Sequence, residues 1–317
     1  MPPLSSSGGG RIVFASKRDD NYEIYVMNSD GTNQRRLTNN PREDGRPAWS
    51  PDCRQVAFES DRSGHVDIYV MDVADALQGT DGANVRRLTN KGDNGYPAWS
   101  PAPPGGTSGA QIAFSRYDPG SDLYVMPAPV PAAQVSADSA NQQRLTQTGV
   151  DGVDMDIFDP DWSPDGTQMV CVVDSNPDPS DEESAIYVLN VREIIQGKGS
   201  AHLRSLPRAG SYLNDNPAWS PKGSQIAFSA EVDGHRGIYV VNADGTDLRR
   251  LTQTKDYDEF APAWSPDGTQ IVYQANPDGN WDIYIMNVAD ALQGTGGTGR
   301  RRLTTDVAND VDPDWCP

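Results

Sequence analysis

Acidic side chains recur in the short segments that lead into six Pro-x-Trp phrases, and their chemistry is the first feature of this sequence that could serve a function. Carboxylate oxygens bind hard cations such as Ca²⁺, which takes about six to eight oxygen ligands, and they attract basic side chains. The candidate ligand-binding carboxylates are Asp44, Asp93, Asp215, Asp258, Glu259 and Asp310. If the six segments converge in space, they form one acidic site.

Three aromatic residues, Tyr96, Phe158 and Tyr257, lie in the same segments. Aromatic faces supply contact area and cation–π interactions, so a surface that mixes them with carboxylates suits a peptide or a sugar. Because carboxylates favour basic groups, we expect a peptide or protein partner with basic residues.

Motifs for catalysis are sparse. His65, His202 and His235 lie in separate repeats, and the sequence contains no Gly-x-Ser-x-Gly phrase, phosphate-binding loop or metal-binding cysteine spacing. We therefore expect a binding protein that is not an enzyme and has no organic cofactor. The alternative is a carbohydrate-active hydrolase or lyase that uses a pair of these carboxylates.

The three cysteines are an odd number in a long chain, which argues against a disulfide framework. Neither Cys53 nor Cys171 has a base nearby in sequence, so we expect both to be unreactive.

Six repeats must position all of these residues. The tryptophans of the Pro-x-Trp phrases are 45 to 63 residues apart, at positions 49, 99, 162, 219, 264 and 315. Each of the first five is followed by a short apolar run, an Ile-Tyr-Val-Met-like phrase and, usually, Arg-Leu-Thr. These runs are bounded by Pro, Asp and Gly, as strands are. Asp52, Asp165 and Asp267 are interpreted as turn residues between the first two strands.

The order of these strands at the two ends of the sequence predicts a closed ring. The sequence enters the repeat at its second strand, residues 12–14, and the missing first strand is supplied by residues 313–316. This pattern predicts an all-β fold, a six-bladed β-propeller with four-stranded antiparallel blades and three-plus-one closure by the C-terminal strand. Residues 73–79, 191–197 and 288–294 are expected to form short helical turns. We interpret residues 1–10 as a flexible linker and residues 11–317 as a single propeller domain.

In such a ring the acidic segments surround one mouth of the central channel. Asp161 and Asp314 directly precede a Trp where the four other copies have Ala, and they are three repeats apart, so they face each other across the axis. Like charges repel unless a cation, water or a shifted pKa relieves them. We predict a channel cation, Ca²⁺, with the ligands Asp44, Asp156, Asp161, Asp310 and Asp314.

The phrases Pro-x-Trp-Ser-Pro-Asp-Gly, Asp-Ile-Tyr-Val-Met and Arg-Arg-Leu-Thr together resemble the propeller domain of TolB and its relatives, a WD-like bacterial repeat family, over residues 11–317. The resemblance implies a six-bladed propeller and peptide binding at its mouth, and it adds support for channel Ca²⁺. The N-terminal α/β domain of TolB has no counterpart in this sequence. Propellers that gate peptidases also belong to the family, which leaves a gating domain as a third reading.

The formal net charge is −19 at pH 7, which argues against nucleic acid and anionic membranes as partners. No apolar run reaches the length of a membrane span, so we expect no membrane insertion, and we expect a monomer. A periplasmic or extracellular location would follow if a signal or membrane anchor precedes this sequence.

Overall fold

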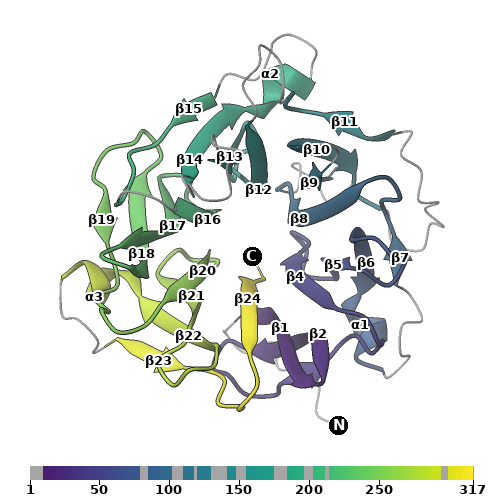
Figure 1. Cartoon of the computed structure of the whole chain (residues 1–317), viewed down its shortest axis with the longest axis horizontal. Helices are drawn as coiled ribbons and strands as arrows, with labels where there is room; N and C mark the ends of the chain where they lie inside the picture. The colour runs from purple at the N-terminus through teal and green to yellow at the C-terminus, as the bar shows by residue number, and fades with distance from the viewer. Residues whose placement is uncertain are drawn as a thin grey trace.

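The computed structural model describes residues 10–78, 85–101, 110–117, 120–129, 141–147, 155–174, 184–195, 203–210, 214–293 and 299–316. These residues form six four-stranded antiparallel sheets, which stand as blades around a central axis (Figure 1). The predicted six-bladed propeller is confirmed.

Each blade runs outward from an inner first strand. Blade 1 contains β24 (Asp310–Trp315), β1 (Arg11–Asp19), β2 (Asn21–Asn28) and β3 (Arg35–Arg36), and blade 2 contains β4 (Asp44–Trp49), β5 (Gln55–Ser60), β6 (Asp67–Asp72) and β7 (Arg86–Arg87). Blade 3 contains β8 (Asp93–Trp99), β9 (Gln111–Tyr117), β10 (Ser121–Pro127) and β11 (Gln143–Arg144), and blade 4 contains β12 (Asp156–Trp162), β13 (Gln168–Asp174), β14 (Ser184–Asn190) and β15 (Leu203–Ser205). Blade 5 contains β16 (Asn214–Trp219), β17 (Gln225–Val232), β18 (His235–Asn242) and β19 (Arg249–Arg250), and blade 6 contains β20 (Glu259–Trp264), β21 (Gln270–Ala275), β22 (Asp282–Asn287) and β23 (Arg300–Arg302).

Short helical turns follow the third strand in three blades, where the sequence predicts them. They are α1 (Val73–Ala76), α2 (Val191–Ile195) and α3 (Val288–Leu292). The predicted segments continue to residues 79, 197 and 294, which lie outside the described residues. None of the helices in the described ranges is long and apolar enough to cross a membrane.

The C-terminal strand closes the ring as predicted. β24 is hydrogen-bonded to β1, with Ile12 opposite Trp315 and Ser16 opposite Asp310. In Figure 1 the yellow end of the chain therefore lies beside its purple beginning.

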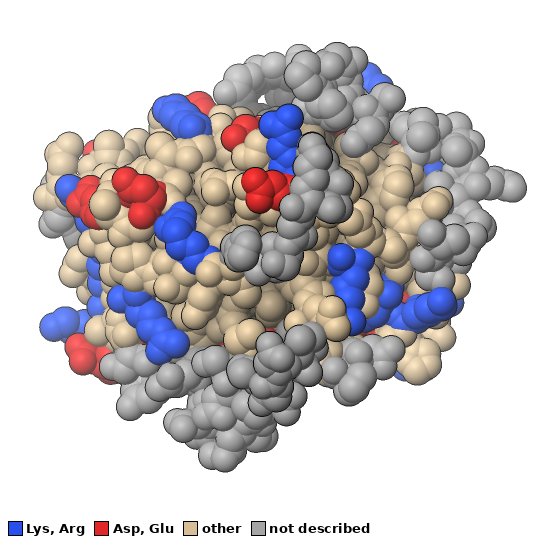
Figure 2. Space-filling view, turned by 90° about the horizontal axis from the view of Figure 1, so that it is seen from above, with Lys and Arg blue, Asp and Glu red and all other residues tan. Residues whose placement is uncertain are grey.

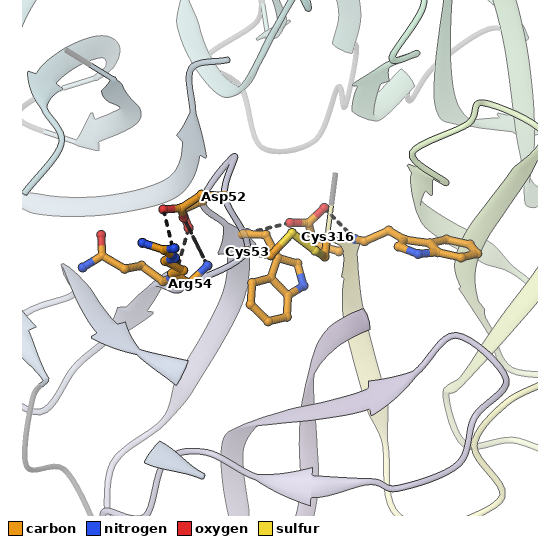
Figure 3. The surroundings of a disulfide bond; sticks show 9 residues. Asp52, Cys53, Arg54 and Cys316 are labelled. Atoms are coloured by element: carbon orange, nitrogen blue, oxygen red, sulfur yellow. Dashed lines mark hydrogen bonds and ion pairs between the residues drawn. A yellow bond between two sulfur atoms is a disulfide. The ribbon is translucent and has the colours of Figure 1, made fainter. Parts of the chain in front are cut away.

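A disulfide bond adds a covalent link at this closure, and our expectation for the cysteines is wrong here. Cys53, in the turn between β4 and β5, is bonded to Cys316, which directly follows β24 (Figure 3). Their Cα atoms are 5.6 Å apart, although the residues are 263 positions apart in sequence. Sequence reasoning predicted the closure but missed this pair, because the strand pattern does not place the turn after β4 beside the end of β24. Cys171 is a free, buried thiol, and burial raises its pKa.

The hydrophobic core lies between neighbouring blades. Trp49, for example, packs with Val26 of blade 1 and with Val56 and Phe58 of its own blade 2. Corresponding clusters join every adjacent pair of blades among the described residues. The repeat tryptophans therefore fill space between blades and stabilise the ring as a whole.

Each inner strand contains a β-bulge at its Pro-x-Trp phrase. The pairing of β4 with β5 shifts between Gly45 and Ala48, and the other five inner strands shift at the equivalent place. Proline has no N–H to give to the ladder, so it is tolerated at such a bulge. The residue before each Pro has a positive φ of 44° to 55°. The bulge thereby fixes which side chains line the channel.

Candidate functional site in the central channel

The six inner strands enclose a central cavity of about 560 Å³. We call the residues that precede each Pro of the Pro-x-Trp phrases the bulge ring: Arg46, Tyr96, Asp159, Asn216, Ala261 and Asp312. We call the residues that precede each Trp the inner ring: Ala48, Ala98, Asp161, Ala218, Ala263 and Asp314. The described lining residues therefore include four carboxylates and one cationic side chain, that of Arg46.

Blades 1 and 4 supply all four carboxylates, because both read Asp-Pro-Asp-Trp. These blades are opposite each other in the ring of six (Figure 1). Asp159 and Asp161 thus stand on one wall of the channel, and Asp312 and Asp314 stand on the opposite wall. The channel has two acidic walls rather than a uniform acidic rim.

Arg46 is held in the bulge ring by blades 2 and 3. Its Nη1 atom lies 2.9 Å from Oε2 of Glu59, and its guanidinium carbon lies 4.0 Å from the ring centroid of Tyr96. The Tyr96 N–H donates to Oε1 of Glu59 at 2.6 Å. Burial raises the pKa of Glu59, while Arg46 opposes that shift. The Arg46 side chain keeps 43 % of its surface exposed, so it can still contact a ligand in the channel.

Asp159 and Asp312 are poorly solvated carboxylates. Asn216 donates from Nδ2 to Asp159 at 3.1 Å. Burial raises the pKa of Asp159 to about 7, with Arg46 opposing the shift. Burial likewise raises the pKa of Asp312, again against Arg46. A cationic group placed between them would favour their charged forms.

Asp161 and Asp314 each join two blades through backbone hydrogen bonds. Asp161 accepts from the N–H of Trp162 at 2.9 Å and of Trp219 at 2.6 Å. Asp314 accepts from Trp315 at 2.8 Å and from Trp49 at 2.7 Å.

Burial raises the pKa of Asp161 to about 6 and that of Asp314 to about 7, although the hydrogen bonds lower both. The charge of Asp161 also raises the pKa of Asp314 from across the axis. Shifted pKa values are thus one of the ways, expected from the sequence, in which repulsion between the two carboxylates is reduced.

Three other predicted carboxylates lie outside the channel lining and are fully buried in ion pairs. Asp44 pairs with Arg62 at 2.7 Å, and Asp310 pairs with Arg18 at 2.9 Å. Glu259 pairs with Arg300 at 3.1 Å and accepts from the Thr254 hydroxyl. These carboxylates tie the strands of the blades together.

The remaining predicted carboxylates bind the neighbouring blade. Asp93 accepts from the N–H of Val66, Asp156 from that of Ser121 and Asp258 from that of Arg236, at 3.2, 2.5 and 2.9 Å. Asp215 accepts from the Ser184 hydroxyl at 3.1 Å and lies 3.3 Å from Arg236. Their oxygens are engaged in blade-to-blade contacts.

The five predicted calcium ligands do not converge. Asp161 and Asp314 face the channel, whereas Asp44, Asp156 and Asp310 are absent from its lining. Across the described ranges, no group of three or more His, Cys, Asp or Glu side chains is placed to hold a metal ion. A cation between Asp161 and Asp314 stays a prediction, and we derive no function from it.

The predicted aromatic residues occupy different places. Tyr96 lines the channel, and Phe158 lies beside it with ring centroids 5.8 Å apart. Tyr257 is partly buried away from the channel, where its hydroxyl lies 3.3 Å from Nη1 of Arg300. Our candidate list omitted Arg46, Asp159, Asn216 and Asp312. Their signal is their place directly before the Pro of each repeat.

Comparison with known proteins places this architecture in a family. The sequence matches the TolB beta propeller domain over residues 1–151 and 137–293. The chain belongs to the TolB β-propeller family. A protein TolB homolog of Chlorobaculum tepidum is 33 % identical over 141 residues, which cover 44 % of this chain and 28 % of that protein.

Solved structures share the fold at lower identity. TolB from Acinetobacter baumannii has a TM-score of 0.71 at 20 % identity, covering 97 % of this chain and 67 % of that one. A puromycin hydrolase has a TM-score of 0.57 at 15 % identity, covering 85 % of this chain and 40 % of that one. The chain spans about half the length, or less, of the curated relatives that it matches. These two structures are similar to this chain in fold.

Proposed function

We propose that this TolB-like propeller is a non-catalytic binding module that receives a peptide or protein segment with a basic side chain at its channel. The excess of carboxylates in the channel lining supports this proposal. Asp159, Asp161, Asp312 and Asp314 stand on two opposite walls, and Arg46 is the one cation among the described lining residues. A Lys or Arg side chain that enters between the walls would offset this charge.

The bulge ring also supplies a surface for the rest of such a segment. Tyr96 lines the channel next to Phe158, and Arg46 and Asn216 carry hydrogen-bond donors. Buried aromatic and Arg anchors contribute most of the binding energy at many protein interfaces. One curated relative is named a Tol-Pal system protein, which agrees with a protein-binding role.

The flank of the ring offers less selectivity for charge. Figure 2 shows blue and red side chains interspersed on the visible flank, with no continuous patch of either sign. On this visible flank the described residues therefore offer no counterpart to the two acidic walls of the channel.

The test is binding of a Lys-rich peptide, measured by calorimetry at two salt concentrations. We expect affinity that falls with salt, and about a tenfold loss in the Asp159→Asn/Asp312→Asn variant, because an electrostatic contact of this kind contributes on the order of 1 kcal/mol. Asp247→Asn is the matched control. Asp247 is 48 % exposed and absent from the channel lining, so its loss should leave binding unchanged.

An oligosaccharide panel distinguishes the enzymatic alternative. Turnover of a sugar that is insensitive to salt, together with no binding of the basic peptide, would contradict the proposal. Equal losses in the channel and control variants would show that only overall charge matters.

A further inference from the structure

Two of the cysteines occupy positions at which the other repeats have a different residue type. Cys53 occupies the turn between the first and second strands, where three other blades have Gly166, Gly223 and Gly268. Cys316 follows the Trp of the sixth phrase, where the five other copies have Ser. Both departures from the repeat are found at the same junction, between blades 1 and 2.

The backbone of the turn does not explain Cys53. The equivalent glycines have φ values of 67°, 74° and 69°, and Cys53 has a φ of 57°. This left-handed region favours glycine, because a Cβ atom is crowded there. A contact outside the turn must therefore account for a Cys at this position.

The usual role of Ser does not apply at position 316. In blade 2 the hydroxyl of Ser50 accepts from the N–H of Gln55 at 2.9 Å and donates to Asp52 at 2.7 Å, which caps the turn between β4 and β5. In blade 1 the second strand is β1, from the other end of the sequence, so position 316 has no such turn to cap.

The disulfide accounts for both departures. Figure 3 shows Cys53 and Cys316 bonded at the junction of the two blades. Cys316 is 8 % exposed and packs in the core cluster of blades 1 and 2, and Cys53 is partly exposed against the same cluster. The bond therefore ties the closing strand of blade 1 to blade 2, in addition to its ladder with β1.

We propose that this pair is a redox-dependent closure of the propeller: the ring is closed covalently in oxidising surroundings and by non-covalent contacts alone when the pair is reduced. The oxidant is a disulfide of the glutathione class. The Cys53 thiolate attacks it and forms a mixed disulfide with release of one thiol. The Cys316 thiolate then attacks the Cys53 sulfur and releases the second thiol. An excess of a thiol reductant reverses both steps.

Reduction should loosen one strand rather than unfold the ring. β24 keeps its pairing with β1, and Asp314 still accepts from the N–H of Trp49. Local opening of β24 should become easier, because its covalent tether is lost.

The first test counts thiols in the full chain after alkylation under denaturing, non-reducing conditions. With three cysteines in the sequence and one of them free, we expect one reactive thiol before reduction and three after it. The second test compares melting with and without dithiothreitol, where we expect a fall of about 5–10 °C on reduction. Hydrogen exchange of the β24 amides should accelerate about tenfold or more, with blades 3 to 5 unchanged.

The variant Cys53→Gly/Cys316→Ser restores the residues of the repeat and should fold without turn strain. Its melting temperature and β24 exchange should be independent of dithiothreitol, while Cys171→Ala, with the pair intact, should keep the dependence of the parent. Three reactive thiols in protein refolded with glutathione disulfide would overturn the proposal. So would reduction that leaves both melting and β24 exchange unchanged.

Discussion

At the scale of single residues, the channel carboxylates make stability depend on pH. Asp161 and Asp314 have pKa values of about 6 and about 7, raised from 3.8 chiefly by burial. Between pH 4 and 7 the folded protein therefore holds protons that the unfolded chain has lost, so these groups make stability fall as pH rises. Asp161→Ala/Asp314→Ala, which restores the Ala of other blades, should remove this dependence. Between pH 5 and pH 8 the free energy of unfolding of the variant should therefore rise, relative to that of the parent, by on the order of 3 kcal/mol.

Denaturant unfolding at several pH values measures this difference, and parallel curves for variant and parent would contradict it.

The same pair of proteins tests the predicted cation. After chelation, calorimetry and melting with millimolar Ca²⁺ should show heat and a raised melting temperature in the parent only, because a ligand that binds only the native state stabilises it. No response in the parent would leave a channel without a specific cation.

At the scale of the elements, a recurring side-chain cluster holds the short fourth strands. β7 has two residues, and its blade anchors it through Thr89, whose hydroxyl donates to Asp67 at 2.8 Å and accepts from the N–H of Ile68 at 2.9 Å. Arg87 adds an ion pair to Asp67 at 2.6 Å. Thr89→Val should cost about 1–3 kcal/mol of unfolding free energy, because it leaves a buried donor and a buried acceptor without this partner. The control Thr305→Val alters an exposed residue and should change the unfolding free energy by less than about 0.5 kcal/mol. Equal costs would show that the hydroxyl has no anchoring role.

At the scale of the whole molecule, the ring depends on its closing strand. Deletion of residues 313–317 removes the pairing of Trp315 and Asp314 with β1, the bond from Asp314 to Trp49, and the disulfide. It should lower the melting temperature by more than Cys53→Gly/Cys316→Ser does, because it also exposes the edge of β1. Deletion of residues 1–9 is the control and should have little effect. A truncated protein that melts like the full chain would contradict this role for β24.

The sequence alone was sufficient to predict the repeat, the number of blades, the strand order and the closure by residues 313–316. These features follow from local chemistry that recurs along the chain, such as the turn at Asp165 and Gly166, where the Thr167 N–H donates to the aspartate at 3.0 Å. Apolar runs and turn residues specify strands and hairpins with little help from the rest of the molecule, and six copies of one pattern leave few architectures open.

Only the tertiary structure decided which acidic residues face the channel and which cysteines meet. Asp159 directly precedes the Pro of its Pro-x-Trp phrase, and Asp44 lies three residues before the Pro of its own phrase. The bulge turns Asp159 into the channel, whereas Asp44 pairs with Arg62 in the turn that follows the neighbouring strand β5. Such choices depend on the bulge, which interrupts the regular alternation of the strand, and on partners elsewhere in the chain. Cys53 and Cys316 meet for the same kind of reason: the packing of blade 1 on blade 2 places the β4–β5 turn beside the end of β24, although the two cysteines are 263 residues apart in sequence.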